Sequence, residues 1–472
     1  MNSVASGVQR LDALATSPVV DRLATAFAAA GHELALVGGP VRDAFLGRSV
    51  SDLDFTTDAR PDEILRIVTP LSETQWDVGR EYGTIGALVR GEPVEITTYR
   101  ADAYDGETRK PVVEFGDTLE ADLIRRDFSV NAMALRLPAR VLVDPSGGME
   151  DLVAARLRTP GPPEVSFGDD PLRMLRAARF TSQLGFTATA ETVSAMVALA
   201  PRIAIVSVER INAELSKLLT TDSPRAGIQL LVDTGLAQLI LPEIPALRLE
   251  IDEHAHHKDV YEHSLTVLDQ AIGYEKARGH EPDLILRLAA LLHDIGKPST
   301  KRVEDRGVVS FHHHDSVGAK LATKRLTALR FDKETITAVA KLIELHLRFF
   351  GYAEGAWTDA AVRRYVRDAG PLLERLHILT RADVTTRNRR KADQLGFAYD
   401  DLETRIAEIA EAEGVAAVRP DLDGEEIMSI LGLKPGREVG EAYRFLLDLR
   451  LDEGPLGADE AKQRLLDWWG AR

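Results

Sequence analysis

The segment that most constrains the fold of this chain is residues 34–54, an apolar run that ends in two glycines and is followed by two aspartates. The run predicts a buried strand that stops at Gly38 and Gly39, where glycine lets backbone N–H groups approach a polyphosphate closely. Asp52 and Asp54 are two positions apart, so on an extended strand both carboxylates lie on one face. Two convergent carboxylates suit Mg²⁺, which shares its coordination shell with substrate phosphates. An isolated Asp-x-Asp is usually a solvated turn, but this ordered combination is typical of nucleotidyl transfer.

Composition places the chain among ordinary soluble proteins. Its 472 residues are 44% hydrophobic and 28% charged, which is enough chain and core for several domains. The sequence has no cysteine, which excludes disulfides, thiolate metal sites and a cysteine nucleophile. No apolar run approaches the roughly 18 residues that a membrane span needs, and no signal-peptide pattern is seen at the start. A cytoplasmic location without a membrane partner is therefore expected.

The net charge and the local basic clusters give opposite indications about nucleic-acid binding. The net charge of −16 argues mildly against such a partner, because phosphate binding favours Lys and Arg. Basic residues nevertheless cluster late in the chain, at Arg363, Arg364, Arg367, Arg387, Arg389, Arg390 and Lys391. These clusters are either solvated helix faces or RNA contacts, and the sequence does not choose between them.

Hydrophobic periodicity divides the chain into an α/β region and a helical remainder. Strands are expected at 33–37, 84–90 and 93–99, and early helices at 19–30, 40–47 and 61–70. Later helices are expected at 170–184, 190–200, 207–219 and 224–237. The polar stretch 101–117 predicts a loop, and the turn-rich stretch 241–259 predicts a boundary. We therefore expect an α+β chain with a mixed-sheet head (1–155), a helical neck (156–245), a second helical domain (246–400) and a helical tail (401–472).

Residues 124–135, IRRDFSVNAMAL, form a second chemical cluster. Arg125 or Arg126 is expected to bind phosphate, because a guanidinium makes bidentate contacts with phosphate oxygens. Asp127 is expected to cap a helix, and Asn131 to hold a sugar or the loop geometry. Capping alone remains an alternative explanation of the segment.

A third cluster, GDDPLRMLRAARF at 168–180, predicts a helix with arginines along one face. Arg173, Arg176 and Arg179 recur every three residues. Asp170 supplies an acceptor and Arg173 a planar fork of donors, which together suit the Watson–Crick edge of a base. The alternative is an exposed helix covered by salt bridges.

With these segments in place, the chain resembles the class II tRNA nucleotidyltransferases, which comprise the CCA-adding enzymes and their bacterial poly(A) polymerase relatives. The matching segments are LVGGPVRD with DLD (36–54), RRDFSVNAMA (125–134), DPSGGMEDL (144–152), DDPLRMLRAARF (169–180) and SVERINAELSKLL (207–219). They occur in family order and cover about the first 240 residues. The resemblance implies a polymerase beta-like mixed sheet with helices, followed by an elongated all-α body.

The resemblance also implies roles for the matching positions. Asp52 and Asp54 would bind the catalytic Mg²⁺, with Glu95 as a third carboxylate. The residues expected around the nucleotide are Gly38, Gly39, Arg42, Arg126, Asp127, Asn131, Asp170, Arg173, Arg176 and Arg179. Asp170 and Arg173 would recognise the base, and Glu209 and Arg210 match the motif that stabilises their helix. Asp169 stands where the family usually has Glu, a change that keeps the charge.

Residues 263–383 carry a pattern of histidines and aspartates. Its members are His263, His293, Asp294, His314, His346 and Asp383. A lone buried histidine is more often a packed core residue, but imidazole and carboxylate together suit a divalent transition metal. The pattern resembles the HD phosphohydrolase domain, whose core ligands match His263, His293, Asp294 and Asp383, with His314 and His346 accessory. The triple histidine at 312–314 is also compatible with an adventitious metal site.

The resemblance implies template-independent addition of CCA to the 3′ end of tRNA from CTP and ATP. A poly(A) polymerase and an enzyme that adds only A, or only CC, share the same motifs. Asp105 and Arg109, in the loop DGETR, favour terminal A addition, because related CC-only enzymes lack that element. A metal-dependent phosphohydrolase is the alternative from another class, whereas a non-catalytic RNA-binding module fits poorly with paired carboxylates and paired glycines. The oligomeric state stays open.

Overall fold

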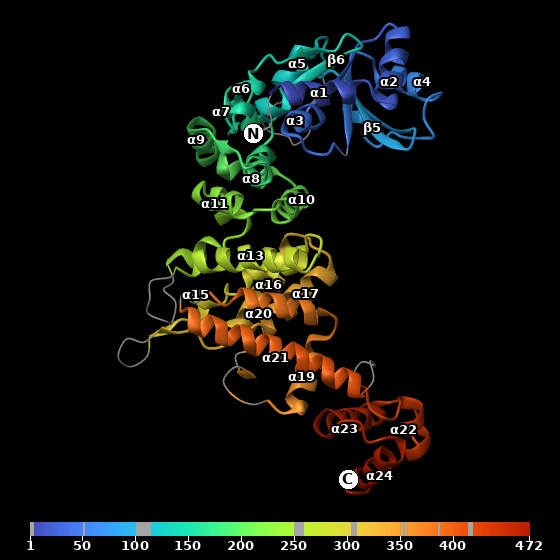
Figure 1. The fold of residues 1–472 in the computed structure, drawn as a ribbon, viewed down its shortest axis with the longest axis vertical. Coiled ribbons are helices and arrows are strands. Elements are labelled where there is room, and N and C mark those ends of the chain that lie inside the picture. Colours follow the sequence, from blue (N-terminus) through green and yellow to red (C-terminus); the bar gives the residue numbers. More distant parts are fainter. Residues whose placement is uncertain are drawn as a thin grey trace. The chain divides into compact units, whose positions relative to one another are not determined.

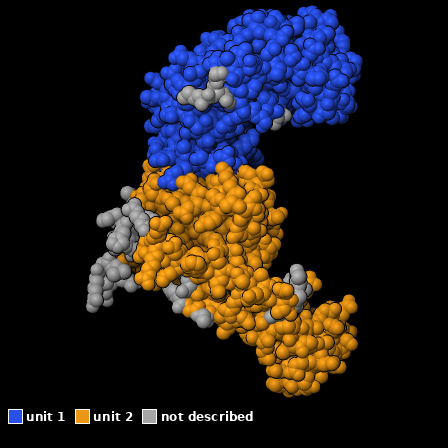
Figure 2. Space-filling model, viewed as in Figure 1, with its two compact units in different colours: residues 1–240 blue, residues 241–472 orange. Residues whose placement is uncertain are grey.

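The computed structural model describes residues 4–50, 52–100, 115–249, 259–303, 309–349, 351–352, 355, 357–385, 388–413 and 419–472. The chain forms two compact units, residues 1–240 and 241–472, which Figure 2 shows in separate colours. No helix in these ranges combines the length and the apolar character needed to cross a bilayer. Each unit is described below by itself.

A seven-stranded sheet organises the first unit, in the order β3-β4-β5-β2-β1-β6-β7. Its strands are β1 (Leu34–Val37), β2 (Leu53–Thr57), β3 (Thr74–Trp76), β4 (Thr84–Val89), β5 (Glu92–Thr98), β6 (Ala134–Leu137) and β7 (Val141–Val143). The pair β2 and β5 is parallel, and the other neighbours are antiparallel. The strands expected at 33–37, 84–90 and 93–99 are therefore confirmed.

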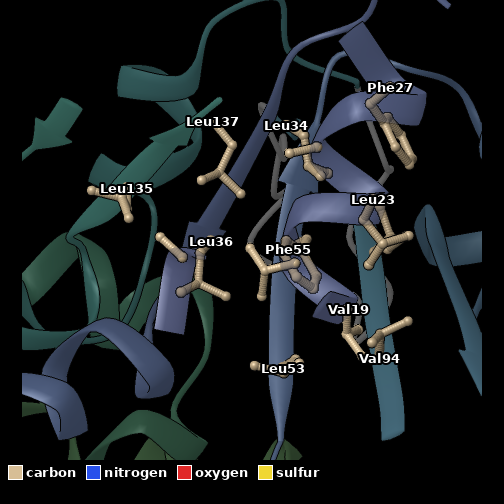
Figure 3. Close-up of a cluster of buried hydrophobic side chains, with 14 of the residues drawn as sticks. Val19, Leu23, Phe27, Leu34, Leu36, Leu53, Phe55, Val94, Leu135 and Leu137 are labelled. Carbon is tan, nitrogen blue, oxygen red and sulfur yellow. The ribbon is translucent and has the colours of Figure 1, made fainter. Parts of the chain in front are cut away.

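Helices cover one face of this sheet and form the main core with it. They are α1 (Val4–Ala15), α2 (Pro18–Ala29), α3 (Gly39–Leu46) and α4 (Pro61–Val68). Figure 3 shows Leu23 and Phe27 of α2 beside Leu34 and Phe55 of the central strands. Alternate strand positions such as Ile85, Val94 and Ile96 are fully buried in this core, as the period-2 pattern requires. The carboxylate-bearing positions therefore project from the opposite face.

Helices and a two-stranded parallel sheet, β8 (Arg156–Leu157) with β9 (Thr187–Ala188), complete the first unit after the seven-stranded sheet. The helices are α5 (Leu119–Ile124), α6 (Gly148–Val153), α7 (Pro163–Asp169), α8 (Leu172–Leu184), α9 (Ala190–Leu199), α10 (Val208–Leu219), α11 (Arg225–Asp233) and α12 (Leu236–Ile240). α11 packs closely on α8 at Gly227, where an added Cβ would lie 2.3 Å from the carbonyl oxygen of Ala178. The helix expected at 170–184 is thus confirmed as α8, and it packs against α10 and α11 (Figure 1).

Where the structure describes it, the second unit is helical apart from turns, loops and two short strands, β10 (Arg302–Val303) and β11 (Val309–Ser310). Its metal-ligand pattern lies on or beside α13 (Val260–Ala277), α14 (Leu284–Leu292), α16 (His314–Ala328), α17 (Lys333–Leu345) and α20 (Leu373–Ala382). The other helices are α15 (Lys297–Thr300), α19 (Asp359–Ala369), α21 (Arg389–Glu413), α22 (Gly424–Leu431), α23 (Arg437–Glu453) and α24 (Ala458–Gly470). Helices α22 to α24 form a small core of their own around Ile427, Leu446 and Leu465.

The basic cluster at 363–367 binds the tail. Arg363 is buried and donates to the carbonyl oxygen of Leu451, and Arg364 pairs with Asp452. Arg367 pairs with Asp368 at 2.8 Å. These partners hold the cluster within the protein, and RNA contact by either cluster remains a prediction. Arg389, Arg390 and Lys391 are exposed, and Arg387 lies outside the described residues.

Candidate functional sites in the two units

Three carboxylates converge on the open face of the first unit's sheet. Asp54 on β2 lies directly beside Glu95 on the parallel strand β5, so their side chains project to the same face. Asp52 precedes β2 by one residue and is two positions from Asp54. Burial, then Glu95 and Asp52, raise the pKa of Asp54 to about 6, although Arg126 opposes the shift. Such crowded carboxylates fit a divalent cation, which relieves their mutual repulsion.

The glycine turn faces an arginine. Gly38 has a positive φ of 75° and stands immediately before α3. A Cβ on Gly38 would lie 3.4 Å from Nη1 of Arg126, so this guanidinium lies over the turn. Among the described residues, the buried Nε of Arg126 has no hydrogen-bond partner. The turn and Arg126 thus form a positively charged edge beside Asp54, suited to a polyphosphate.

Asp122 fixes the two neighbouring arginines and was not identified from the sequence. Its buried carboxylate accepts from Nη2 of Arg125 at 2.7 Å and from Nη2 of Arg126 at 3.1 Å. It also accepts from the hydroxyl of Thr56 at 3.2 Å, which ties it to the carboxylate-bearing strand β2. Burial raises the pKa of Asp122, but Arg126 and Arg125 outweigh burial and hold it below its usual value. Arg126 is therefore oriented by a fixed negative charge.

Arg42 and Asn131, which were each expected to contact the nucleotide, are hydrogen-bonded to each other and to neighbouring carboxylates. Arg42 donates to Asn131 Oδ1 at 2.6 Å and to the two carboxylate oxygens of Asp43 at 2.9 and 2.8 Å. Asn131 in turn donates to Asp127 Oδ1 at 3.0 Å. The arrangement makes Arg42 and Asn131 part of a buried support beside the glycine turn. Contact with a phosphate remains a prediction for Arg42, and contact with the sugar remains one for Asn131.

Asp127 joins the sheet to helix α8. One of its oxygens accepts from the backbone N–H of Phe128 at 2.8 Å, and the other accepts from Nε of Arg176 at 2.8 Å. Burial raises the pKa of Asp127, but Arg176 and the amide of Asn131 together lower it to about 2. Asp127 therefore stays ionised at neutral pH and forms a buried ion pair with Arg176. The expected helix cap was wrong, because the residue that precedes the short helix Ser129–Asn131 is Phe128, without a side-chain cap.

The arginine face of α8 is salt-bridged, yet it is not an exposed face. Arg179 is only 8% exposed and donates from Nε to Glu214 on α10 at 2.7 Å. Nη1 of Arg176 lies 3.6 Å from the same buried carboxylate. The ring of Phe180 lies beneath three guanidinium carbons, those of Arg42, Arg176 and Arg179, at 5.3, 5.4 and 4.1 Å. Glu214 and Phe180 were both missed from the sequence, where they read as ordinary helix positions.

Asp170 and Arg173, the expected base-recognition pair, lie at the start of α8. Arg173 donates to Ser166 Oγ at 2.8 Å and to the carbonyl oxygen of Arg125 at 2.6 Å. Asp170 accepts from Arg210 at 2.9 Å, which connects α8 to the segment expected to stabilise it. Arg173 therefore brings the start of α8 next to the Arg125–Arg126 pair and the glycine turn. Asp105 and Arg109 lie outside the described residues.

The second unit gathers all six predicted metal-ligand residues. Two groups of three each place their ligand atoms within 4.8 Å of one another: His263, His293 and Asp383, and Asp294, His314 and His346. Nε2 of His263 lies 2.9 Å from Asp383 and 3.3 Å from Nε2 of His293. Nε2 of His314 lies 3.3 Å from Asp294. The six residues, of which His263 and Asp383 are 120 positions apart in the sequence, thus lie together in one largely buried cluster.

Backbone carbonyls orient the rings of this cluster. Nδ1 of His293, His314 and His346 lies 2.9, 2.8 and 2.6 Å from the carbonyl oxygen three residues earlier. This arrangement leaves Nε2 of each ring for a ligand. Nε2 of His346 is buried and has no hydrogen-bond partner among the described residues. Burial and the neighbouring His293 lower the pKa of His346 to about 4, so its ring is neutral and able to ligate a metal.

The carboxylates of the cluster are ionised. Burial raises the pKa of Asp294, but His293 and Lys297 outweigh burial and hold it well below its usual value. Burial also raises the pKa of Asp383, but His263 and His293 outweigh burial and hold it well below its usual value. Burial lowers the pKa of His293, but Asp294 and Asp383 outweigh burial and raise it to about 10, so a metal that binds there displaces a proton from the ring. Imidazole rings beside ionised carboxylates are the donor set of a divalent transition metal, and the residues present fit such an ion.

Three family models match the chain. They are the poly A polymerase head domain over residues 34–158, the probable RNA and SrmB-binding site of polymerase A over 185–247, and the HD domain over 260–388. Together they cover both the carboxylate site and the histidine cluster.

Curated relatives and solved structures agree with these matches. The A-adding tRNA nucleotidyltransferase of Deinococcus radiodurans is 36% identical over 444 residues, which is 92% of this chain and 95% of that protein. The CCA-adding enzyme of Bacillus subtilis is 44% identical over 208 residues, 44% of this chain and 51% of that enzyme. The Bacillus stearothermophilus CCA-adding enzyme in complex with CTP superposes with a TM-score of 0.70 at 25% identity, covering 97% of this chain and 99% of that one.

Proposed function

This chain belongs to the tRNA nucleotidyltransferase family, and from that premise we propose that it adds C, C and A to the 3′ end of tRNA from CTP and ATP. The observation that carries the proposal is the parallel pairing of β2 with β5, which sets Asp54 beside Glu95 next to the glycine turn. The bound CTP of the superposed enzyme and the 208-residue match to a CCA-adding enzyme support it. With this substrate, the proposal includes a cytoplasmic location.

The residues divide the reaction between them. Asp52, Asp54 and Glu95 would hold Mg²⁺, which lowers the pKa of a hydroxyl and neutralises the leaving phosphates when bound. Gly38 and Arg126 hold the triphosphate. The tRNA 3′-oxygen bonds to the α-phosphorus, the α–β phosphoanhydride bond breaks, pyrophosphate leaves, and the hydroxyl proton passes to a carboxylate of the cluster.

Base selection falls to the start of α8. Asp170 accepts and Arg173 donates towards the Watson–Crick edge, as the sequence predicted. Asp127 and Glu214 hold α8 by its other arginines, Arg176 and Arg179. Because these contacts are buried and ionic, the helix presents a fixed surface to the base, and no nucleic-acid template is needed.

The lengths of the products test this proposal. A tRNA transcript ending at the discriminator base is incubated with Mg²⁺ and labelled CTP, ATP or both, and the products are separated on a sequencing gel. We expect growth by three nucleotides, requiring both nucleotides and then stopping. A long ladder with ATP alone identifies a poly(A) polymerase instead and contradicts CCA addition.

Addition of the terminal A alone is the second candidate. It is favoured by the full-length likeness to the A-adding enzyme of Deinococcus radiodurans, which extends through the second unit. A tRNA transcript already ending in CC separates the two. An A-adding enzyme extends only this transcript, whereas a CCA-adding enzyme also extends the one that ends at the discriminator base.

For the second unit we propose a divalent transition metal held by His263, His293, Asp294 and Asp383, with His314 and His346 beside it. Phosphoester hydrolysis is the activity that such a site supports, since the metal activates water when bound. Nε2 of His346 has no hydrogen-bond partner in the part of the chain that the structure describes, and this observation favours a missing ligand over a packed core.

Metal content tests this site separately from the transferase. After desalting from Mn²⁺, wild type is expected to retain metal, and Asp294→Asn and His346→Asn to retain about ten- to a hundredfold less at equal free metal. His280→Ala is the matched control, because His280 pairs with Glu374 away from the cluster. Equal metal content in wild type and both cluster variants contradicts the site.

A further inference from the structure

A single row of residues crosses the sheet from the carboxylates to its edge strand. Asp54 on β2 neighbours Glu95 on β5, Glu95 neighbours Gly86 on β4, and Gly86 neighbours Trp76 on β3. Direct neighbours across a sheet project to the same face. Trp76 therefore lies on the same face as the metal-binding carboxylates.

Gly86 has no side chain, and the indole of Trp76 packs over it towards β5. A Cβ on Gly86 would lie 1.9 Å from Nε1 of Trp76 and 2.1 Å from its Cε2, so the indole occupies the space that a side chain there would fill. Neighbouring strands are about 4.8 Å apart, so the indole above β4 is about one strand spacing from the Glu95 strand. Trp76 remains 38% exposed, which leaves one side of its ring open to a ligand.

Only Gly86 lies between Trp76 and Glu95 in this row, and the residues on one side of the row are small and polar. Thr84 and Thr97 lie on this face, and their hydroxyls are 2.9 Å apart. Glu95 is exposed, and Asp52 is exposed as well. Ile85 and Ile96 point to the other face and are fully buried, whereas Leu88 and Pro93 lie on this face on the other side of the row. The row thus forms a surface with the aromatic ring of Trp76 at one end and the carboxylates of Glu95 and Asp54 at the other.

The nucleotide-binding elements lie on the opposite side of the carboxylates. Proceeding from β2 away from β5, the sheet continues to β1, which ends at the Gly38 turn beneath Arg126. Arg173 is hydrogen-bonded to Arg125 on that side. A transfer reaction brings two substrates to the carboxylates, and the side of Trp76 is the one that the nucleotide elements leave free.

We propose that the indole of Trp76 stacks on the 3′-terminal base of the tRNA being extended and so positions its hydroxyl at the carboxylates. This inference rests on the proposed function. Stacking tolerates every base, because every base has a π-face. That property suits an enzyme whose primer ends in the discriminator base, then in C, then in C again, since a hydrogen-bonding site specific for one base would reject the others.

Replacing Trp76 by alanine tests whether its indole stacks on the terminal base. Trp76→Ala is expected to raise KM for tRNA about tenfold, as loss of one stacked base does, and to leave KM for CTP and ATP unchanged. Trp76→Phe keeps a stacking ring and is expected to restore most of the affinity. Val78→Ala is the matched control, because Val78 is 87% exposed and two residues away. An unchanged KM for tRNA in a folded Trp76→Ala overturns the inference.

A second variant displaces the indole without replacing Trp76 itself. Gly86→Ala adds a methyl at 1.9 Å from Nε1 and must displace the ring, so it is expected to reproduce the tRNA defect of Trp76→Ala. The double variant is expected to be no worse than either single one. Additive losses mean that the two residues act separately and contradict the proposed contact.

An abasic primer identifies the partner of the ring. Wild type is expected to bind a tRNA with an abasic 3′-terminal nucleotide about tenfold more weakly, and Trp76→Ala to bind both tRNAs equally. Equal discrimination by both proteins shows that Trp76 does not touch that base. Absence of any incorporation by wild type, in contrast, is a failure of the proposed function itself, so the two failures are distinguishable.

Discussion

Replacing Asp54 by asparagine is expected to abolish nucleotide incorporation and, without divalent cations, to raise the melting temperature of the first unit at pH 8. Loss of a metal-binding carboxylate lowers the rate about a thousandfold or more. Stability rises because burial and the neighbours Glu95 and Asp52 disfavour the ionised carboxylate, as its pKa of about 6 records. The cost of ionising it in the folded state is about 2 kcal/mol after allowance for its partial exposure.

The sign of this effect depends on pH. The pKa of Asp54 is raised on folding from 3.8 to about 6, so the wild-type protein loses stability as pH increases through that window. Above pH 6 the asparagine variant should melt at the higher temperature, and below pH 4 the two should agree. Asp77→Asn, on an exposed side chain, is the control and should change neither activity nor stability. Equal melting of wild type and Asp54→Asn at pH 8 would show that the carboxylates are not crowded.

Replacing Asp127 by alanine is expected to cost the first unit about 3–5 kcal/mol of unfolding free energy. The variant removes the acceptor of Arg176, of Asn131 and of the Phe128 N–H while leaving a guanidinium that is largely surrounded by protein. Calorimetry that resolves separate transitions measures the loss, because a chain of two units need not unfold in one step.

The contribution of Asp127 also has a defined pH window. Folding lowers its pKa from 3.8 to about 2, so its stabilisation is present above pH 4 and disappears as pH falls through 2. Asp12→Ala is the matched control, since Asp12 pairs with Arg140 at the surface. A loss below about 1 kcal/mol in Asp127→Ala would contradict the idea that this carboxylate joins the sheet to α8.

Local pattern was sufficient for the elements that carry the motifs. The strand before Gly38, the hairpin around Gly91 and helix α8 follow from alternation, glycine and the 3.6-residue period, and the structure confirms them. The edge strands β3 and β7 were not predicted. Each has three residues and little burial, so neither shows a hydrophobic alternation.

The contacts between distant segments could not be predicted from local sequence patterns. The place of Trp76 in the row with Asp54 depends on the strand order β3-β4-β5-β2, which a sequence does not state. Asp122, Phe180 and Glu214 were missed for the same reason, since each acts on a residue from another element. Arg363 binds a carbonyl 88 residues away, which its position in a basic cluster does not reveal.

The central claim is that nucleotide transfer takes place at the paired strands β2 and β5 rather than at the histidine cluster. The most direct test measures incorporation of labelled AMP into a tRNA ending in CC by Glu95→Gln and Asp294→Asn side by side, each confirmed as folded by circular dichroism. We predict that Glu95→Gln loses incorporation and that Asp294→Asn retains it. Full activity of Glu95→Gln together with loss in Asp294→Asn would contradict the account.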